Sequence, residues 1–210
     1  MRDLAVQVVD GRAEPYAAAP TIVLRLSVTE PSGEPVHAIA LRAQVRIEPQ
    51  RRRYSDTEGD RLLEMFGERG RWGESLRPFA WCHVSTTVPA FTGCTEVDLP
   101  VPVTYDFEVA GAKYLHALEE GEVPLVLLFN GTVFSRRGDG LAVEPVPWHV
   151  EAPYRLPVSV WRDVMDLYFP NSGWIRLQRD TIDALARYKA ERALPSWEQV
   201  VEQLLKEAGA

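Results

Sequence analysis

The sequence predicts an α+β fold, in which an antiparallel β-sandwich of eight or nine strands with short helical insertions precedes a C-terminal tail of three helices. Apolar residues alternate with polar ones, with a period of two, over much of the first part of the chain, whereas helical spacing replaces this period from about residue 158. Strands followed by helices are typical of such folds. We therefore expect a sandwich domain over residues 1–157 and a helical tail over residues 158–210, packed on it as a single structural unit.

The strand predicted over residues 36–48 shows this alternation best. Its odd-numbered positions are apolar except for His37, which we interpret as a hydrogen-bonded core histidine. Residues 22–28 alternate in the same way, and the sequence TEPSGEP between the two segments predicts a hairpin turn. The other expected strands are residues 4–9, 79–88, 95–99, 101–109, 123–134 and 141–146.

One dipeptide in these strands allows two interpretations. Asn130-Gly131 lies inside the apolar run 123–134, where it is compatible with a type I′ hairpin or with a bulge in one long strand. The sequence SRRGDG supplies a second turn only a few residues later. We therefore favour the bulge.

Sequence signals for helices occur between the predicted strands and in the C-terminal tail. Ser55 and Glu58 have the spacing of a capping box at the start of a short helix, and GAKYLHALEEG predicts another. In the tail, Ser159 and Asp180 are expected to cap the first and second helices, and Ser196 with Gln199 the third. These signals place helices between the strands and after them.

The composition excludes several classes of function. A formal net charge of −7 argues against a nucleic-acid-binding surface. No apolar run approaches the length of a membrane span, and the N-terminus lacks the apolar segment of a secretory signal. Two cysteines are too few for a disulfide framework. We expect a cytoplasmic protein that binds neither nucleic acid nor membrane.

The sequence gives only weak evidence for catalytic or metal-binding residues. Cys82, His83 and Cys94 lack the paired spacing of a zinc site, and adjacent residues of a strand face opposite ways. The histidines and serines form no recognisable nucleophile motif. The acidic cluster in ALEEGEVP is explained by solvated charge at a helix end. The sequence therefore predicts no catalytic residues, no metal ligands and no cofactor.

Two segments of the chain are rich in arginine. QRRRY, at residues 50–54, could bind phosphate through bidentate hydrogen bonds, but three arginines on an acidic protein more often form an exposed turn. SRRGDG also contains consecutive arginines. No glycine-rich phosphate loop accompanies either segment, so we expect exposed turns.

Aromatic residues concentrate in the last third of the chain, where they either pack helices against the sheet or leave a protein-binding surface. The segment YFPNSGWIRLQRDT, residues 168–181, is expected to be the joint between two tail helices. Its candidates for contact with a partner protein are Tyr168, Asn171, Trp174 and Arg176.

Five segments together resemble one family. They are GRAEPYAAAPTIVLRL, RIEPQRRRY, VSTTVPAFTG, DLPVPVTYDFEVAGAKYLHALEEGEVPLVLLFNGTVF and YFPNSGWIRLQRDT. Along essentially its whole length the chain resembles a mainly actinobacterial family of bacterial domains of unknown function. The family has no assigned activity, so the resemblance assigns no catalytic residues to this chain. It does imply genes near those of NiFe hydrogenases and their accessory proteins, and hence an accessory or assembly role.

Three hypotheses of function follow. The first is a non-catalytic protein that binds another protein, as an accessory or assembly factor for a metalloenzyme such as a NiFe hydrogenase. The second is an enzyme or small-ligand-binding protein with a site between sandwich and tail, for which a pocket of several hundred cubic ångströms would be evidence. The third is a homo-oligomer formed through a strand edge or the tail.

Overall fold

The computed structural model has two antiparallel sheets and a set of helices, and it describes residues 3–103, 109–137, 140–172 and 177–209. The first sheet has the order β1-β2-β5. Its strands are β1 (Ala5–Ala13), β2 (Thr21–Thr29) and β5 (Cys94–Pro102). The second sheet has the order β4-β3-β6-β7, with β8 also paired to β6. Its strands are β3 (Val36–Ile47), β4 (Phe79–Val88), β6 (Glu122–Arg137), β7 (Gly140–Pro145) and β8 (Glu151–Pro157). The α+β prediction is confirmed.

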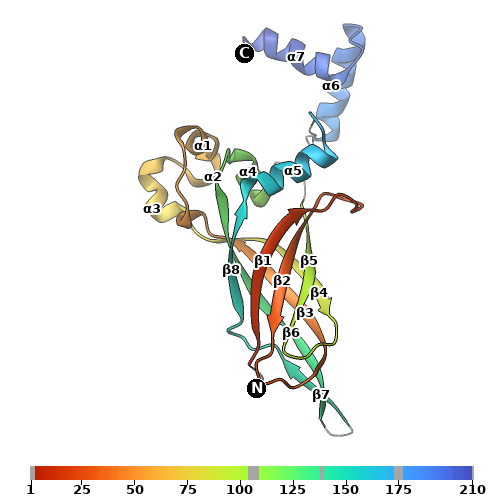
Figure 1. The fold of residues 1–210 in the computed structure, drawn as a ribbon. Coiled ribbons are helices and arrows are strands. Elements are labelled where there is room, and N and C mark those ends of the chain that lie inside the picture. The colour runs from red at the N-terminus through yellow and green to blue at the C-terminus, as the bar shows by residue number, and fades with distance from the viewer. Residues whose placement is uncertain (1–2, 104–108, 138–139, 173–176, 210) are drawn as a thin grey trace. The chain divides into compact units, whose positions relative to one another are not determined.

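The helices fall into three groups. The insertion between β3 and β4 contains η1 (Pro49–Arg51), α1 (Asp56–Arg61), α2 (Leu63–Phe66), η2 (Arg69–Arg71) and α3 (Trp72–Ser75). A single helix, α4 (Ala110–Ala117), precedes β6. After β8 come α5 (Val158–Tyr168), α6 (Arg179–Glu191) and α7 (Trp197–Ala208). Figure 1 shows α1 to α5 gathered at one end of the two sheets.

The core lies between the sheets, on the faces that the alternation predicted. Side chains of β2 and β3 meet there with those of β5, β6 and β8. The inward-facing residues of β2 and β3 are Ile22, Leu24, Leu26, Val28, Ile39, Leu41, Ala43, Val45 and Ile47, each at most 2% exposed. At about 25 cal/mol per Å² of apolar surface removed from water, this burial is the main force that holds the sheets together.

β6 is one strand of sixteen residues, so a hairpin at Asn130-Gly131 does not form. Its register with β3 runs without a shift through both residues. On its other edge the partner changes from β8, which pairs with residues 122–128, to β7, which pairs with residues 132–137. Gly131 has φ 143°, and a Cβ there would lie 2.0 Å from the carbonyl oxygen of Ala40. Only glycine fits this position.

His37 corrects one expectation. Its side chain is exposed, although it has the same parity as the buried residues of β3. The register between β3 and β6 shifts between Val36 and Ala38, so the alternation is interrupted there. His37 is therefore not a core histidine.

The expected caps are partly confirmed. Ser55 and Glu58 form a complete capping box on α1, and the hydroxyl of Ser196 accepts a hydrogen bond from the amide of Gln199 at 3.2 Å. The Ser159 prediction is wrong, because β8 leads directly into α5 at Val158. The Asp180 prediction is also wrong, since Asp180 lies in the first turn of α6, one position after the helix begins.

The chain divides into two compact units, Met1–Gly173 and Trp174–Ala210. The first contains both sheets and α5, which contacts β1 and β2. The second contains the helical hairpin α6–α7. The sequence-based division into residues 1–157 and 158–210 remains a prediction.

Candidate functional site

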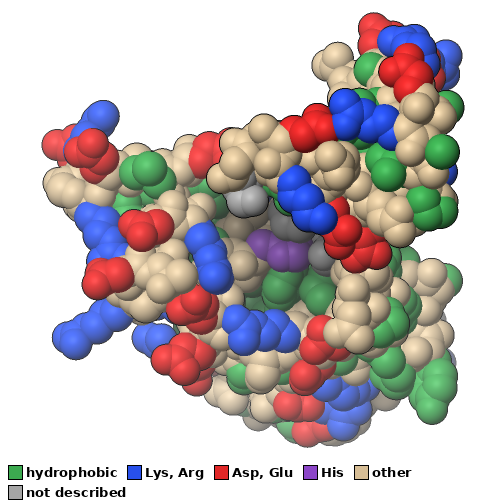
Figure 2. Space-filling view, turned by 90° about the horizontal axis from the view of Figure 1, so that it is seen from above, with side chains coloured by type: hydrophobic (Ala, Val, Ile, Leu, Met, Phe, Trp, Pro, Cys, Tyr) green, Lys and Arg blue, Asp and Glu red, His purple; other side chains and the backbone are tan. Residues whose placement is uncertain are grey.

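The helix-bearing end of the first unit contains a hollow of about 580 Å³ between α4 and α5. Figure 2, which looks down on this end, shows a histidine in a hollow with acidic and basic side chains around it. The lining residues are His116, Trp161, Arg162, Met165, Asp166, Phe169, Asn171 and Ser172. His116 comes from α4, and the other residues come from α5 and the segment that follows it.

The inner part of the hollow is aromatic and apolar. Trp161 and Met165 are 4% and 7% exposed, because they share the buried face of α5 with Val158 and Val164. The His116 and Trp161 rings meet edge to face, with centroids 4.4 Å apart. Burial lowers the pKa of His116, so its imidazole is neutral at pH 7.

One buried donor in this wall has no acceptor. The Nε1–H of Trp161 is inaccessible to solvent and has no hydrogen-bond partner among the residues that the structure describes. Buried donors without an acceptor are uncommon in folded proteins. Because solvent does not reach this donor, it lies within the packing beneath the wall, and the surface that the wall presents is apolar.

The rim of the hollow is polar. Arg162, Asp166, Asn171 and Ser172 are exposed, and they supply charges of both signs together with an amide and a hydroxyl. Arg162 also joins the two helices, because its Nη2 donates to the carbonyl oxygen of Leu118 at 3.0 Å. An apolar interior with a polar rim is the anatomy of a pocket that receives a side chain of a partner or a small ligand.

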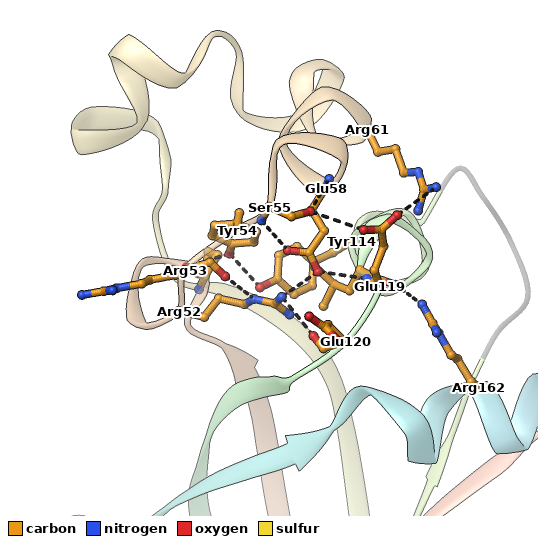
Figure 3. A network of polar contacts seen from close by, with 12 residues as sticks. Arg52, Arg53, Tyr54, Ser55, Glu58, Arg61, Tyr114, Glu119, Glu120 and Arg162 are labelled. Atoms are coloured by element: carbon orange, nitrogen blue, oxygen red, sulfur yellow. Dashed lines mark hydrogen bonds and ion pairs between the residues drawn. The ribbon is translucent and has the colours of Figure 1, made fainter.

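A buried ion pair holds the end of α4, which forms one wall. Arg52 Nη2 lies 2.7 Å from Glu58 Oε1, and the two side chains are 8% and 3% exposed. Glu58 Oε1 also accepts the amide of Glu119 at 2.9 Å, and Arg52 Nη2 donates to the carbonyl oxygen of Glu120 at 3.2 Å (Figure 3). The capping box of Ser55 thus positions a carboxylate that fixes the chain immediately after α4.

The electrostatics of this network favour its charged form. Burial alone would raise the pKa of Glu58, but hydrogen bonds from the Glu119 and Ser55 amides and the charge of Arg52 outweigh it and lower the pKa. Tyr54 and Tyr114, whose hydroxyl oxygens are 2.8 Å apart, lie beside the pair. Burial raises the pKa of Tyr114 to about 12, so both rings stay neutral.

The candidate residues predicted from sequence have separate positions. Asn171 lines the hollow and has φ 52°, a left-handed conformation that asparagine adopts more readily than most residues. Tyr168 has a structural role, because its hydroxyl lies 2.9 and 2.8 Å from the carbonyl oxygens of Glu14 and Ala17 in the β1–β2 loop. Trp174 and Arg176 lie outside the described residues.

Sequence reasoning did not select the remaining lining residues as a site. No motif distinguishes His116 from the other histidines, and Trp161 and Phe169 belong to the aromatic-rich last third of the chain. The useful signal was the helical spacing of Trp161 and Met165. Nothing local links that stripe to His116, because α4 and α5 are separated by three strands.

The described part of the chain was compared with the requirements of a metal site, a reactive thiol and a membrane span. No three histidine, cysteine, aspartate or glutamate side chains of the described ranges are grouped so that they could hold a metal ion. Cys82 is half-buried, and burial raises the pKa of its thiol to about 11, whereas Cys94 is exposed. None of the helices in these ranges combines the length and apolar character needed to traverse a bilayer.

Comparison with known proteins places the chain in a family. Residues 1–210 match the model of the Family of unknown function (DUF6084), and the chain belongs to this family. No curated protein matches the sequence.

Among solved structures, similarity is low. A putative late embryogenesis abundant (LEA) protein is 15% identical with a TM-score of 0.32, and the match covers 74% of this chain and 71% of that one. A β-glucosidase from Kluyveromyces marxianus is 8% identical with a TM-score of 0.27 over 73% of this chain, which spans only 15% of the enzyme's length. At such scores neither likeness bears on function.

Proposed function

We propose that this protein is a non-catalytic cytosolic binding protein that receives an apolar side chain of another protein in the α4–α5 hollow. The observation that carries the proposal is the buried wall of Trp161 and Met165 beneath a rim of charged and polar groups. Anchor pockets at protein interfaces have this construction, because a desolvated apolar centre supplies affinity and the rim excludes water.

The identity of the partner is a further part of the proposal. The resemblance described above implies an accessory or assembly role for a metalloenzyme such as a NiFe hydrogenase. The absence of a recognised nucleophile motif from the sequence agrees with a binding role. Affinity purification from the native host under hydrogenase-expressing conditions tests both parts together.

The sharpest experiment compares two variants of α5. Asp166 lines the rim of the hollow, whereas Asp163 is exposed on the same helix and does not line it. Asp166→Arg is expected to reduce recovery of the partner about tenfold, while Asp163→Arg, with the same change of charge, leaves recovery unchanged. Recovery of the wild-type protein alone would count against the binding role. Equal recovery with both variants would place the interface elsewhere.

A small ligand in the same hollow is the second candidate, because about 580 Å³ lies within the size range of ligand pockets. Native mass spectrometry of protein purified from the host distinguishes the two. A retained small molecule that Asp166→Arg releases would favour the ligand. A homo-oligomer is the third candidate, and light scattering on the purified full chain would detect it.

A further inference from the structure

A second hollow, separate from the first, is dominated by arginine. It measures about 680 Å³ and lies where η1 meets the start of β6 and the middle of β8. Its lining residues are Gln50, Arg51, Arg52, Arg53, Gly121, Glu122 and Arg155. Four guanidinium groups thus surround a hollow that contains one carboxylate, in a chain whose net charge is −7. Positive charge is therefore concentrated here against the overall balance.

Arg52 corrects the expectation that QRRRY is an exposed turn. Its Nη2 is held by Glu58 and by the Glu120 carbonyl, and its Nε–H donates to the carbonyl oxygen of Arg53 at 3.1 Å (Figure 3). Its guanidinium lies 4.9 Å from the centroid of the Tyr54 ring. The Nη1 is buried and has no acceptor within the described ranges. Arg52 is therefore a rigid cationic part of the wall.

The other three arginines have exposed side chains. Arg51 Nε lies 3.4 Å from Glu48 Oε2, and these side chains are 56% and 8% exposed. Arg155 Nη1 lies 3.7 Å from Glu122 Oε2, and both of these side chains are exposed. Arg53 is exposed and has no acidic partner in the part of the chain that the structure describes. An exposed ion pair such as Arg155–Glu122 contributes only about 0–1 kcal/mol, so an incoming anion can replace it.

An apolar hollow of about 450 Å³ adjoins the basic one. The two share Arg51 and Arg155, and the second is otherwise lined by Pro124, Leu125, Pro153 and Tyr154. The prolines give a rigid surface that loses little conformational entropy when a ligand covers it. A ligand that spans both hollows would place a charge at one end and an apolar group at the other.

We propose that these joined hollows bind an organic anion. Its carboxylate or phosphate group contacts Arg51, Arg53 and Arg155, with Arg52 as the fixed positive background. Its apolar part lies over Pro124 and Pro153. Guanidinium groups suit this task, because their planar donors match carboxylate and phosphate oxygens in bidentate geometry and they remain charged at any physiological pH. The proposal is independent of the α4–α5 hollow.

Calorimetric titration of the full chain with phenyl phosphate, benzoate, inorganic phosphate and phenol tests it. We expect phenyl phosphate or benzoate to bind, inorganic phosphate to bind more weakly, and phenol not to bind. The tighter of the two organic anions identifies the preferred head group. Affinity should fall as the salt concentration rises, because the site is open to solvent.

Three variants locate the site. Arg53→Gln and Arg155→Gln should each weaken binding about tenfold, since each removes a charge-assisted hydrogen bond. Arg187→Gln, at an exposed position of α6, makes the same change of charge outside the hollow and should leave affinity unchanged. Circular dichroism confirms that each variant is folded.

Three results would overturn the proposal. The first is that neither organic anion binds at millimolar concentration. In the second, Arg187→Gln weakens binding as much as Arg155→Gln, which would indicate a non-specific effect of net charge. In the third, one of the two partial ligands binds as tightly as phenyl phosphate. For inorganic phosphate, this would show that the apolar hollow does not contribute to binding. For phenol, it would show that the basic hollow does not contribute.

Discussion

The two units of the chain differ most in how much they bury. In the first unit, a continuous set of apolar side chains from β2, β3, β5, β6 and β8 is removed from water. In the second, Val200 is the one described residue of α6 or α7 that is fully buried. Ile182 of α6 is 44% exposed. Trp197, Val201 and Leu205 recur every four residues along α7, and this open row is 50%, 46% and 50% exposed.

This difference shows that regular secondary structure and stability are separate properties. The helices of the second unit have sound local signals, including the Ser196 cap and an ion pair between Arg192 and Glu207. Such interactions contribute tenths of a kilocalorie to about one kilocalorie per mole each. A helical pair of this size has too little buried surface to be stable alone. The free energy of unfolding therefore resides in the first unit.

The largest expected effect comes from the buried ion pair of the first unit. Arg52→Ala leaves the Glu58 carboxylate buried without its partner, and we expect a loss of about 3–5 kcal/mol in the free energy of unfolding. Urea denaturation measures it. The double variant Arg52→Met/Glu58→Gln, which removes both charges but keeps a side-chain oxygen that can accept a backbone amide, should recover part of the loss. A loss below about 1 kcal/mol for Arg52→Ala would show that the ion pair contributes no more than an exposed one.

Matched leucine truncations compare the two units directly. Leu41 is 0% exposed in β3, and Leu205 is 50% exposed in α7. Leu41→Ala should lower the free energy of unfolding by about 2–5 kcal/mol, because it creates a cavity in the core. Leu205→Ala should change it by less than about 0.5 kcal/mol. A large effect of Leu205→Ala in the same urea experiment would mean that the open row is covered by another surface in solution.

Matched cap removals refine the same comparison. Ser55→Ala deletes the cap that positions Glu58, and should lower global stability by about 1–2 kcal/mol. Ser196→Ala deletes an equivalent cap on α7. It should leave global stability unchanged and increase only the local amide hydrogen exchange of α7. Faster exchange in other parts of the chain, or a shift of the main unfolding transition by Ser196→Ala, would contradict the assignment.

The smallest expected effect is a pH dependence from His116. Burial lowers the pKa of His116 in the folded state relative to its unfolded value of about 6.5. Below about pH 6.5 the unfolded state therefore binds the proton first, so stability should decrease as the pH falls and level off once the folded histidine is also protonated.

Urea denaturation between pH 7.5 and pH 5.5 tests this dependence. His116→Gln should remove the slope. His149→Gln, at an exposed position, serves as the control and should retain it. An unchanged slope in His116→Gln would assign the dependence to another group. Glu58, whose pKa is lowered, contributes only at more acidic pH, where its stabilisation is lost.

The sequence predicted those parts of the fold whose signals are local or strictly periodic. Alternation identified the buried faces of β2 and β3, and the Ser55–Glu58 spacing identified the capping box. It missed β8, a short strand with a proline at Pro153 that is recognisable only through its pairing with β6. It also misplaced His37, because the irregularity of β3 there arises in its pairing with β6.

Local sequence signals predicted less about the candidate sites than about the fold. Asn171 lines the α4–α5 hollow, and its contact with a partner stays a prediction. The walls of the hollow come from helices separated by three strands. The arginines of residues 51–53 were noticed, yet their composition indicated only an exposed turn. Burial of Arg52 depends on Glu58 and on the end of α4, which lies more than sixty residues further along the chain.

The sequence by itself determined the periodicity of the strands, the starts of α1 and α7, and the order of strands before helices, because these depend on residues within a few positions of one another. The tertiary structure alone decided which arginine is buried, which histidine lines a hollow, and where two hollows join. Those properties depend on distances between residues far apart in the chain. Such distances are set only when the sheets close over their core.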